Sequence, residues 1–279
     1  MISHPDATAD LPRSLLLVGA GKMGGAMLEG WLARGLDPER VTVLEPHPSP
    51  ALLTLAAGKA IALNPSLDAI EPPELVVLAI KPQALPASAP GLAPLVGPAS
   101  ALVSILAGKT VADLRRALPG ASAIVRAMPN LPASIGRGAT GAYATRATTA
   151  RQRAATHALL AANGIVEWVE HEDLIDAVTA LSGSGPAYVF HLVECMAAAG
   201  AAAGLPAELA ARLARATVSG AGALLDAHAA DPAELRRNVT SPGGTTAAAL
   251  AILMGEPGMT TLMREAVAAA KRRAAELSG

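Results

Sequence analysis

The sequence predicts a two-domain protein, with an α/β domain followed by an all-α domain. Three observations support this prediction. Up to about residue 172, short apolar runs alternate with helical patterns, as they do in the βαβ units of a parallel sheet. A glycine cluster, Gly19–Gly24, separates the first apolar run from the first helical pattern. Beyond Glu172, strand-like runs nearly vanish and alanine-rich helical stretches take over.

In the first domain, residues 1–172, strands and helices are expected to alternate after a loose polar leader at residues 1–12. The strand candidates are short apolar runs, and glycine or proline ends most of them. Strands are expected at Ser14–Val18, Val41–Glu45, Ala60–Leu63, Leu75–Ile80, Ala101–Leu106, Ala123–Ala127 and Ile165–Val169. Helices are expected at Gly24–Gly35, Leu52–Gly58, Val111–Ala117 and Arg151–Asn163.

The second domain, residues 173–279, is expected to contain helices only. Alanine buries little area but allows helices to approach closely, so helix-on-helix packing is expected there. The final helix is expected at about Thr260–Leu277. Turn-forming residues interrupt the helical pattern at Ser182–Pro186, Gly204–Pro206, Ala230–Pro232, Thr240–Gly244 and Gly255–Gly258.

Composition excludes several classes of function. The 279-residue chain has a net charge of −1 and five aromatic residues, which suits neither nucleic acid nor an anionic membrane surface. One cysteine, Cys195, and six histidines without HxxxH spacing leave little support for a disulfide or a metal site. The uncharged stretch Pro82–Gly108 contains five prolines, too many for an ordinary membrane-spanning helix. With no signal-peptide pattern at the N-terminus, a cytoplasmic protein is expected.

The glycine cluster predicts a dinucleotide site. Gly19-Ala20-Gly21-Lys22-Met23-Gly24 fits the GxGxxG pattern between an expected strand and an expected helix. Glycines there allow a tight turn and a close approach of the backbone to a pyrophosphate, which lies on the unpaired amides of the helix N-terminus. Because this strand–turn–helix context is present, the first domain is expected to be Rossmann-like.

Glu45, at the end of the second expected strand, bears on the choice of cofactor. A carboxylate at this place can accept hydrogen bonds from the adenosine ribose and repel a 2′-phosphate, which favours NADH over NADPH. A solvated glutamate at a strand end is an equally good explanation. A protonated His47 nearby would partly offset the preference.

Two other strand ends carry candidate cofactor residues. Lys81 follows a central strand on the side where Rossmann ligands bind, so it can pair with a phosphate or line the reaction cleft. Asn130, after Met128-Pro129, can hydrogen-bond the nicotinamide amide. The alternative for Lys81 is a basic residue that merely ends a strand. The alternative for Asn130 is ordinary Pro-Asn turn chemistry.

Two polar islands interrupt the helical half. In Ser182–Tyr188, Pro186 lies at a favourable position for starting a helix. Capping of that helix would be enough to explain this segment. Thr240–Thr246 combines two glycines with four hydroxyls before the expected helix Ala247–Leu253. Such a nest of backbone amides suits a carboxylate, and capping alone would not need so many hydroxyls.

Together, these motifs resemble the pyrroline-5-carboxylate reductase family of proline biosynthesis, over nearly the whole chain. The segments that carry the resemblance are Leu16–Gly24, Ala79–Gln83, Arg126–Asn130, Ser182–Tyr188 and Thr240–Thr246. It implies a Rossmann domain followed by a helical dimerisation domain, a cleft completed across a homodimer, and further assembly of dimers, commonly to a decamer. The surplus apolar surface of the helices would then face another subunit.

The resemblance also implies roles for individual residues. Ser241, Gly243, Gly244 and Thr245 would hold the substrate carboxylate, and Thr246 would lie near the ring nitrogen as a proton donor. Asn64 would touch the cofactor ribose, and Ala79 and Pro82 fall in a shared cofactor segment. The stretch Glu45–Pro48 departs from the polar or basic patch that accepts the NADPH 2′-phosphate in many members, so either NADH or NADPH is possible, with NADH favoured.

Three alternatives fit the sequence less well. A β-hydroxyacid dehydrogenase needs a catalytic lysine early in the second domain, whereas Lys271, in the final helix, is the only lysine after Lys109. A non-catalytic NAD-binding protein would have no reason to carry Thr240–Thr246. His191 and Glu194, three residues apart, are better explained as a polar pair at a dimer contact than as an acid–base pair.

Overall fold

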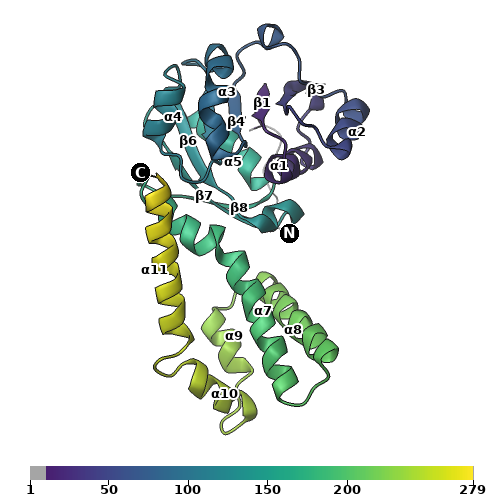
Figure 1. The fold of residues 1–279 in the computed structure, drawn as a ribbon, viewed down its shortest axis with the longest axis vertical. Coiled ribbons are helices and arrows are strands. Elements are labelled where there is room, and N and C mark those ends of the chain that lie inside the picture. The colour runs from purple at the N-terminus through teal and green to yellow at the C-terminus, as the bar shows by residue number, and fades with distance from the viewer. Residues whose placement is uncertain (1–10, 279) are drawn as a thin grey trace. The chain divides into compact units, whose positions relative to one another are not determined.

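The computed structural model describes residues 11–278, which form two compact units (Figure 1). The sheet unit comprises the chain up to Gly183 together with the segment from Lys271 onward, and the helical unit is Ser184–Ala270. Residues 1–10 of the expected leader lie outside the described residues, while Leu11 is buried in the core of the sheet unit. The domain division at residues 172 and 173 remains a prediction.

The sheet unit is built on one eight-stranded sheet with the order β3-β2-β1-β4-β5-β6-β7-β8. The strands pair in parallel except for β6 and β7, which are antiparallel. The bounds are β1 Leu15–Val18, β2 Val41–Leu44, β3 Ala62–Leu63, β4 Leu75–Leu78, β5 Ala101–Ser104, β6 Ala123–Met128, β7 Gly138–Ala144 and β8 Gly164–Trp168. Chain order reverses on the two sides of β1, and this switch point is where such sheets bind their ligands.

Helices cover both faces of the sheet, which explains why the central strands are apolar throughout. On one face, α1 (Lys22–Ala33), α2 (Pro50–Lys59) and α5 (Ala150–Ala161) form one apolar cluster with the strands. On the other, α3 (Leu85–Leu92) and α4 (Val111–Ala117) form a second. The indole of Trp31, fully buried in the first cluster, donates to the carbonyl of Leu159 at 2.9 Å.

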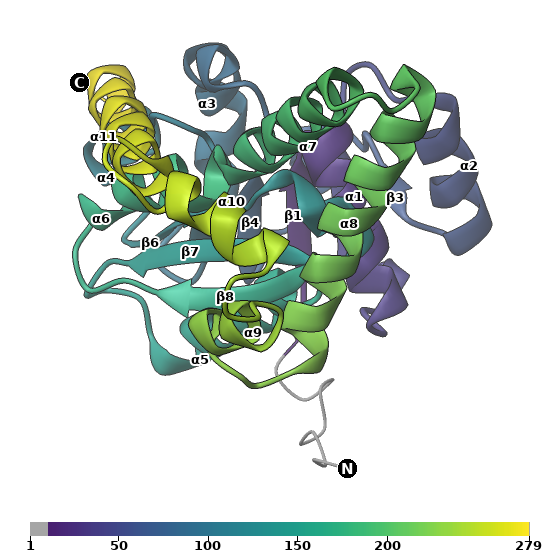
Figure 2. The same ribbon diagram turned by 90° about the horizontal axis from the view of Figure 1, so that it is seen from below.

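Helix α3 and strand β7 of the sheet unit were not predicted from the sequence. Helix α3 accommodates Pro86 in its first turn and Pro90 further along, so prolines that rule out a spanning helix still permit a short one. Strand β7 lies between β6 and β8 (Figure 2) and has few β-branched residues. A Cβ on its Gly141 would lie 2.5 Å from the side chain of Val178. Close packing therefore favours small residues in β7, and these do not form a recognisable strand pattern.

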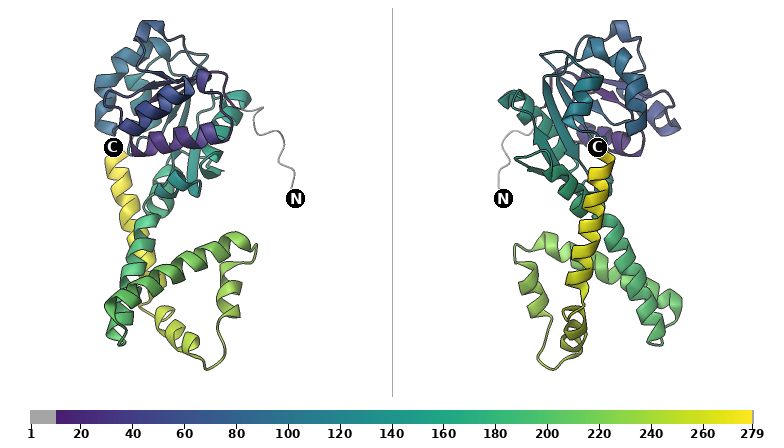
Figure 3. Two further views of the ribbon diagram at one scale, coloured as in Figure 1. Left: turned by 90° about the vertical axis from the view of Figure 1, so that its right-hand side faces the viewer. Right: turned by 60° about the vertical axis from the view of Figure 1, so that its left-hand side comes forward.

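The helical unit confirms the expected all-α C-terminal half. Its helices are α7 Gly185–Ala202, α8 Ala207–Ala227, α9 Pro232–Asn238, α10 Thr245–Leu253 and the first part of α11 Met259–Ser278 (Figure 3). Among its described residues, only Ala210 and Ala214 are buried hydrophobic residues. No helix within residues 11–278 is both long and apolar enough to cross a membrane.

Candidate active site

The glycine loop between β1 and α1 is held against the neighbouring strand β4. Gly19 has a φ of +91°, and a Cβ there would lie 2.7 Å from the carbonyl oxygen of Ala79. A Cβ on Gly24 would overlap the carbonyl of Gly19. A side chain at either position would therefore force the turn apart and displace the N-terminus of α1 from the switch point.

The N-terminus of α1 is free to receive an anion. Gly21 caps the helix without a side-chain hydrogen bond, and the first turn contains no acidic residue. A Cβ on Gly21 would meet no atom within 4 Å, so the space beside the helix end is open there. Unpaired amides and the positive end of the helix dipole fit a pyrophosphate, so these residues suit a dinucleotide.

A cavity of about 450 Å³ adjoins this helix end, and Lys22, Glu45, His47 and Ser134 are among its lining residues. Glu45 is fixed at its edge: one carboxylate oxygen accepts from the amide of Ala20 at 2.9 Å and the other from the amide of His47 at 3.0 Å. A negative charge is thus held between the glycine loop and the loop after β2.

Asn64 is locked against the backbone of Glu45. Its side-chain oxygen accepts from the Glu45 amide and its side-chain nitrogen donates to the Glu45 carbonyl, both at 2.8 Å. Asn64 itself has a φ of +50°, a conformation that asparagine tolerates better than most residues. The structure therefore brings Asn64 and Glu45, which are 19 residues apart, to one edge of the glycine loop.

The predicted residues after β4 lie beside the same loop. The amide of Ala79 donates to the carbonyl of Val18 at 2.8 Å. This bond holds Ala79 next to Gly19. Pro82 begins the short 3₁₀ helix η3 (Pro82–Ala84), and the exposed Lys81 caps it. Lys81 has no ion pair with any residue in the described range. Met23, in the first turn of α1, packs on the core of the sheet unit.

Asn130 joins three segments at the end of β6. Its side-chain oxygen accepts from the amide of Ala139 in β7 at 2.9 Å. Its side-chain nitrogen donates to the carbonyl of Ser182 at 3.2 Å, and the Ser182 hydroxyl donates to the carbonyl of Ala139 at 3.2 Å. Ser182 lies in the π-helical turn η6 (Thr179–Gly183). The predicted contact with a nicotinamide amide remains a prediction, and one N–H of the side chain is left for it.

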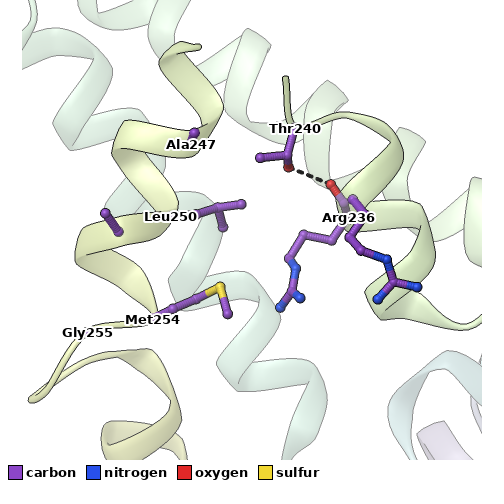
Figure 4. Close-up of a pocket in the computed structure, with 8 residues that line it drawn as sticks. Arg236, Thr240, Ala247, Leu250, Met254 and Gly255 are labelled. Carbon is purple, nitrogen blue, oxygen red and sulfur yellow. Dashed lines mark hydrogen bonds between the residues drawn. The ribbon is translucent and has the colours of Figure 1, made fainter. Parts of the chain in front are cut away.

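The second predicted island, Thr240–Thr246, forms the turn between α9 and α10. The hydroxyl of Thr240 donates to the carbonyl of Arg236 at 2.6 Å (Figure 4), and the amide of Gly244 donates to the carbonyl of Ser241 at 3.0 Å. Gly243 has a φ of +71°, so a glycine suits this position in the turn.

The entrance to α10 is polar and open. Gly244 caps the helix without a side-chain hydrogen bond, so the first helical amides lack an intrahelical partner. Within residues 11–278, the hydroxyls of Ser241, Thr245 and Thr246 also make no hydrogen bond. Together, these amides and hydroxyls can hold a carboxylate through several donors.

A cavity of about 650 Å³ lies beside this turn, between α9 and α10 (Figure 4). Arg236 and Arg237 line it on one side, and Leu250 and Met254 on the other. Neither arginine pairs with a carboxylate among the described residues, so their positive charge remains available to anions near the turn. No sequence pattern indicated these arginines, nor Ser49 and Ser134 at the first cavity.

The polar pair on α7 is hydrogen-bonded. His191 Nδ1 and Glu194 Oε2 lie 2.9 Å apart, and both side chains are about three-quarters exposed. The Cys195 thiol lies 3.5 Å from His191 Nε2. No group of three or more potential metal ligands occurs in the part of the chain that the structure describes.

The chain matches known proteins over most of its length. Residues 172–277 match the family model described as pyrroline-5-carboxylate reductase dimerisation, and residues 14–108 match the model described as NADP oxidoreductase coenzyme F420-dependent. The pyrroline-5-carboxylate reductase of Pseudomonas aeruginosa is 38% identical over 264 residues, which cover 95% of this chain and 96% of the relative. That of Synechocystis sp. is 39% identical over 264 residues, covering 94% and 97%. A solved pyrroline-5-carboxylate reductase from Coxiella burnetii has a TM-score of 0.88 at 33% identity, covering 96% of this chain and 99% of that one.

Proposed function

The chain belongs to the pyrroline-5-carboxylate reductase family. We propose which of its residues bind the cofactor, which bind the substrate and which donates the proton. The enzyme catalyses the NAD(P)H-dependent reduction of the C=N bond of 1-pyrroline-5-carboxylate to L-proline, the last step of proline biosynthesis. The observation that supports this function most strongly is the turn Thr240–Thr246, because its free amides and hydroxyls can hold the carboxylate of a small substrate.

A reduced nicotinamide cofactor, when bound, supplies a hydride to the imine carbon, while the ring nitrogen takes up a proton. An imine is basic enough to be partly protonated already, so a strong general acid is not required. The Thr246 hydroxyl is proposed as the proton donor near the ring nitrogen. The protein then mainly orients the two reactants and anchors the carboxylate.

The cofactor is proposed to lie along the carboxyl ends of β1 and β4. Gly19, Gly21, Lys22, Met23 and Gly24 form the pyrophosphate cradle. This is supported by the uncapped end of α1 and the open space at Gly21. Glu45 and Asn64 would hold the adenosine ribose, and Ala79, Lys81, Pro82 and Asn130 would lie along the nicotinamide half.

The substrate carboxylate is proposed to bind at Ser241, Gly243, Gly244 and Thr245. The unpaired charges of Arg236 and Arg237 beside the turn support this assignment, because they raise the local positive potential. Thr246 follows within the first turn of α10, where its hydroxyl can reach the ring of a substrate held by its carboxylate.

The proposed preference is for NADH over NADPH. Its support is the position of Glu45, whose carboxylate is fixed at the mouth of the cavity by two backbone amides. A 2′-phosphate at this edge would face that negative charge, which a protonated His47 would offset only in part. No metal ion is proposed to take part.

The protein is a homo-oligomer, as its match to a dimerisation model supports. A homodimer that assembles further, to a decamer of five dimers, is proposed, with a cytoplasmic location. The functional domains are proposed as residues 1–172 for the cofactor and 173–279 for dimerisation and substrate.

The direct test is an assay of the purified protein with 1-pyrroline-5-carboxylate and each reduced dinucleotide. We expect a loss of nicotinamide absorbance that depends on the imine, with L-proline formed in equal amount. Absence of turnover with both dinucleotides, in a folded and oligomeric sample, would contradict the proposed function.

A further inference from the structure

Asn163 ties three separate segments of the sheet unit together. It lies just beyond α5 and is 5% exposed. Its side-chain nitrogen donates to the carbonyl of Ala26 in α1 and to the carbonyl of Ala133, both at 3.2 Å. Its own carbonyl accepts from the amide of Gly138 at 2.8 Å. Ala133 lies in the 3₁₀ helix η5 (Leu131–Ile135), directly after Asn130.

Asn163 packs closely against two glycines, Gly30 and Gly138. A Cβ on Gly30 of α1 would overlap the Asn163 amide, and a Cβ on Gly138 would lie 2.7 Å from the Asn163 carbonyl oxygen. Gly30, Ala133 and Asn163 nevertheless line a cavity of about 320 Å³. Helix α1 and η5 also contact each other directly, and the hydrogen bonds of Asn163 add a polar link between them beside this cavity.

The hydrogen-bonding groups of the Asn163 side chain are only partly satisfied. Its side-chain oxygen is buried and has no hydrogen-bond partner among the described residues, and an unpaired buried acceptor is unfavourable. An apolar residue of similar size would avoid that penalty. It would also lose the two donated bonds, through which this side chain links α1 to η5.

These two segments carry opposite halves of the proposed cofactor site. Helix α1 begins at the glycine loop, and η5 begins directly after Asn130, on the proposed nicotinamide side. We infer that Asn163 is a positioning residue for hydride transfer: by clamping η5 to α1, it fixes Asn130 relative to the pyrophosphate cradle. This inference rests on the proposed function. Small displacements of reacting groups lower turnover strongly while affecting binding less.

The test is the variant Asn163→Leu, which keeps the branched shape and the number of side-chain heavy atoms and removes the N–H donors. Thr156→Val is the matched control: Thr156 lies on α5, is fully buried, and its hydroxyl has no partner among the described residues. Both proteins are compared with the unchanged chain by hydrogen exchange without cofactor, and by steady-state kinetics with C4-deuterated reduced dinucleotide. Asn163→Ala replaces the leucine variant if the latter does not fold.

We expect faster exchange at residues 131–139 of Asn163→Leu and a turnover lowered by roughly tenfold to a hundredfold, with the KM for the imine changed by about twofold or less. The primary isotope effect on turnover should rise, because hydride transfer becomes more rate-limiting. The control should match the unchanged protein in each measurement.

A purely structural role predicts a different pattern. In that case, activity would fall in proportion to the folded fraction, with KM and the isotope effect unchanged, and this result would overturn the inference. Unchanged exchange at residues 131–139 would also overturn it. If the unchanged chain has no reductase activity, the proposed function fails on its own, while the exchange measurement still tests whether Asn163 holds η5.

Discussion

Glu45 shows how one side chain can shape both the glycine loop and the choice of cofactor. Its two carboxylate oxygens accept from the amides of Ala20 and His47, so the charge cannot swing away from the cavity without breaking these bonds. The sequence predicted the residue from its place at the end of a strand. It could not predict the two amides, because the loops that supply them adopt their conformations only in the folded sheet.

Replacing Glu45 by Gln separates its two contributions. Glutamine keeps one oxygen that can accept from Ala20, but it removes the negative charge that opposes a 2′-phosphate. We expect the ratio of kcat/KM for NADPH to that for NADH to rise about tenfold, equivalent to about 1.4 kcal/mol.

The control for this change is Glu29→Gln. Glu29 is an exposed acid that lines the same cavity and makes no hydrogen bond or ion pair within residues 11–278. The ratio should stay as it is in the unchanged protein. An unaltered ratio in Glu45→Gln would show that this carboxylate does not set the preference.

At the scale of elements, the sequence predicted most of the sheet but missed β7. Buried strands such as Leu75–Leu78 are continuous apolar runs, which can be recognised in the sequence. Apart from Tyr143, the residues of β7 are small, and Val178 and Ala133 crowd the strand at its glycines. Asn163 was missed for a related reason: its two acceptors, Ala26 and Ala133, lie 137 and 30 residues away, and no local pattern reveals such contacts.

Helix α4 begins with a capping box whose strength depends on pH. Thr110 and Asp113 exchange side-chain and backbone hydrogen bonds. Partial burial raises the pKa of Asp113, but hydrogen bonds from the Thr110 amide, the Thr110 hydroxyl and Arg116 outweigh it, so the pKa lies below its ordinary value of 3.8. A lowered pKa stabilises the fold above the unfolded-state value, and this contribution is lost as the pH falls through the folded-state value.

The variant Asp113→Asn tests this cap. We expect a free energy of unfolding lower by about 1 kcal/mol at neutral pH, as for the loss of a helix cap. The difference from the unchanged protein should shrink as the pH falls below about 3.8. Denaturant unfolding at several pH values measures it, with the exposed Glu167→Gln as control; a difference that is constant with pH would contradict the assignment.

At the scale of the whole molecule, the helical unit explains the unusual composition. Its helices bury almost none of their own apolar side chains, whereas Ile252 is 77% exposed and Val239 is 68% exposed. Soluble single chains rarely expose so much apolar surface. Large exposed apolar side chains occur on α7, α8, α10 and α11: Val189, Phe190, Met196, Leu213, Leu224, Leu225, Ile252, Leu253, Met259, Leu262 and Met263. Leu205, Val239 and Met254, between the helices, are exposed as well.

This surface predicts that the isolated single chain is not a stable species. Light scattering coupled to size exclusion should give a mass of at least twice the 27.9 kDa of one chain, and dilution should lower the Tm, since folding is linked to assembly. A folded species of single-chain mass, with a Tm independent of concentration, would contradict the account of the helical unit.

The turn Thr240–Thr246 is proposed to recognise the carboxylate of a cyclic imine. The most direct measurement compares kcat/KM for 1-pyrroline-5-carboxylate with that for 1-pyrroline, which has the same ring and no carboxylate. We predict a value lower by roughly a hundredfold or more for 1-pyrroline, because it forfeits at least two hydrogen bonds to a charged group. Equal values for the two imines would contradict the claim.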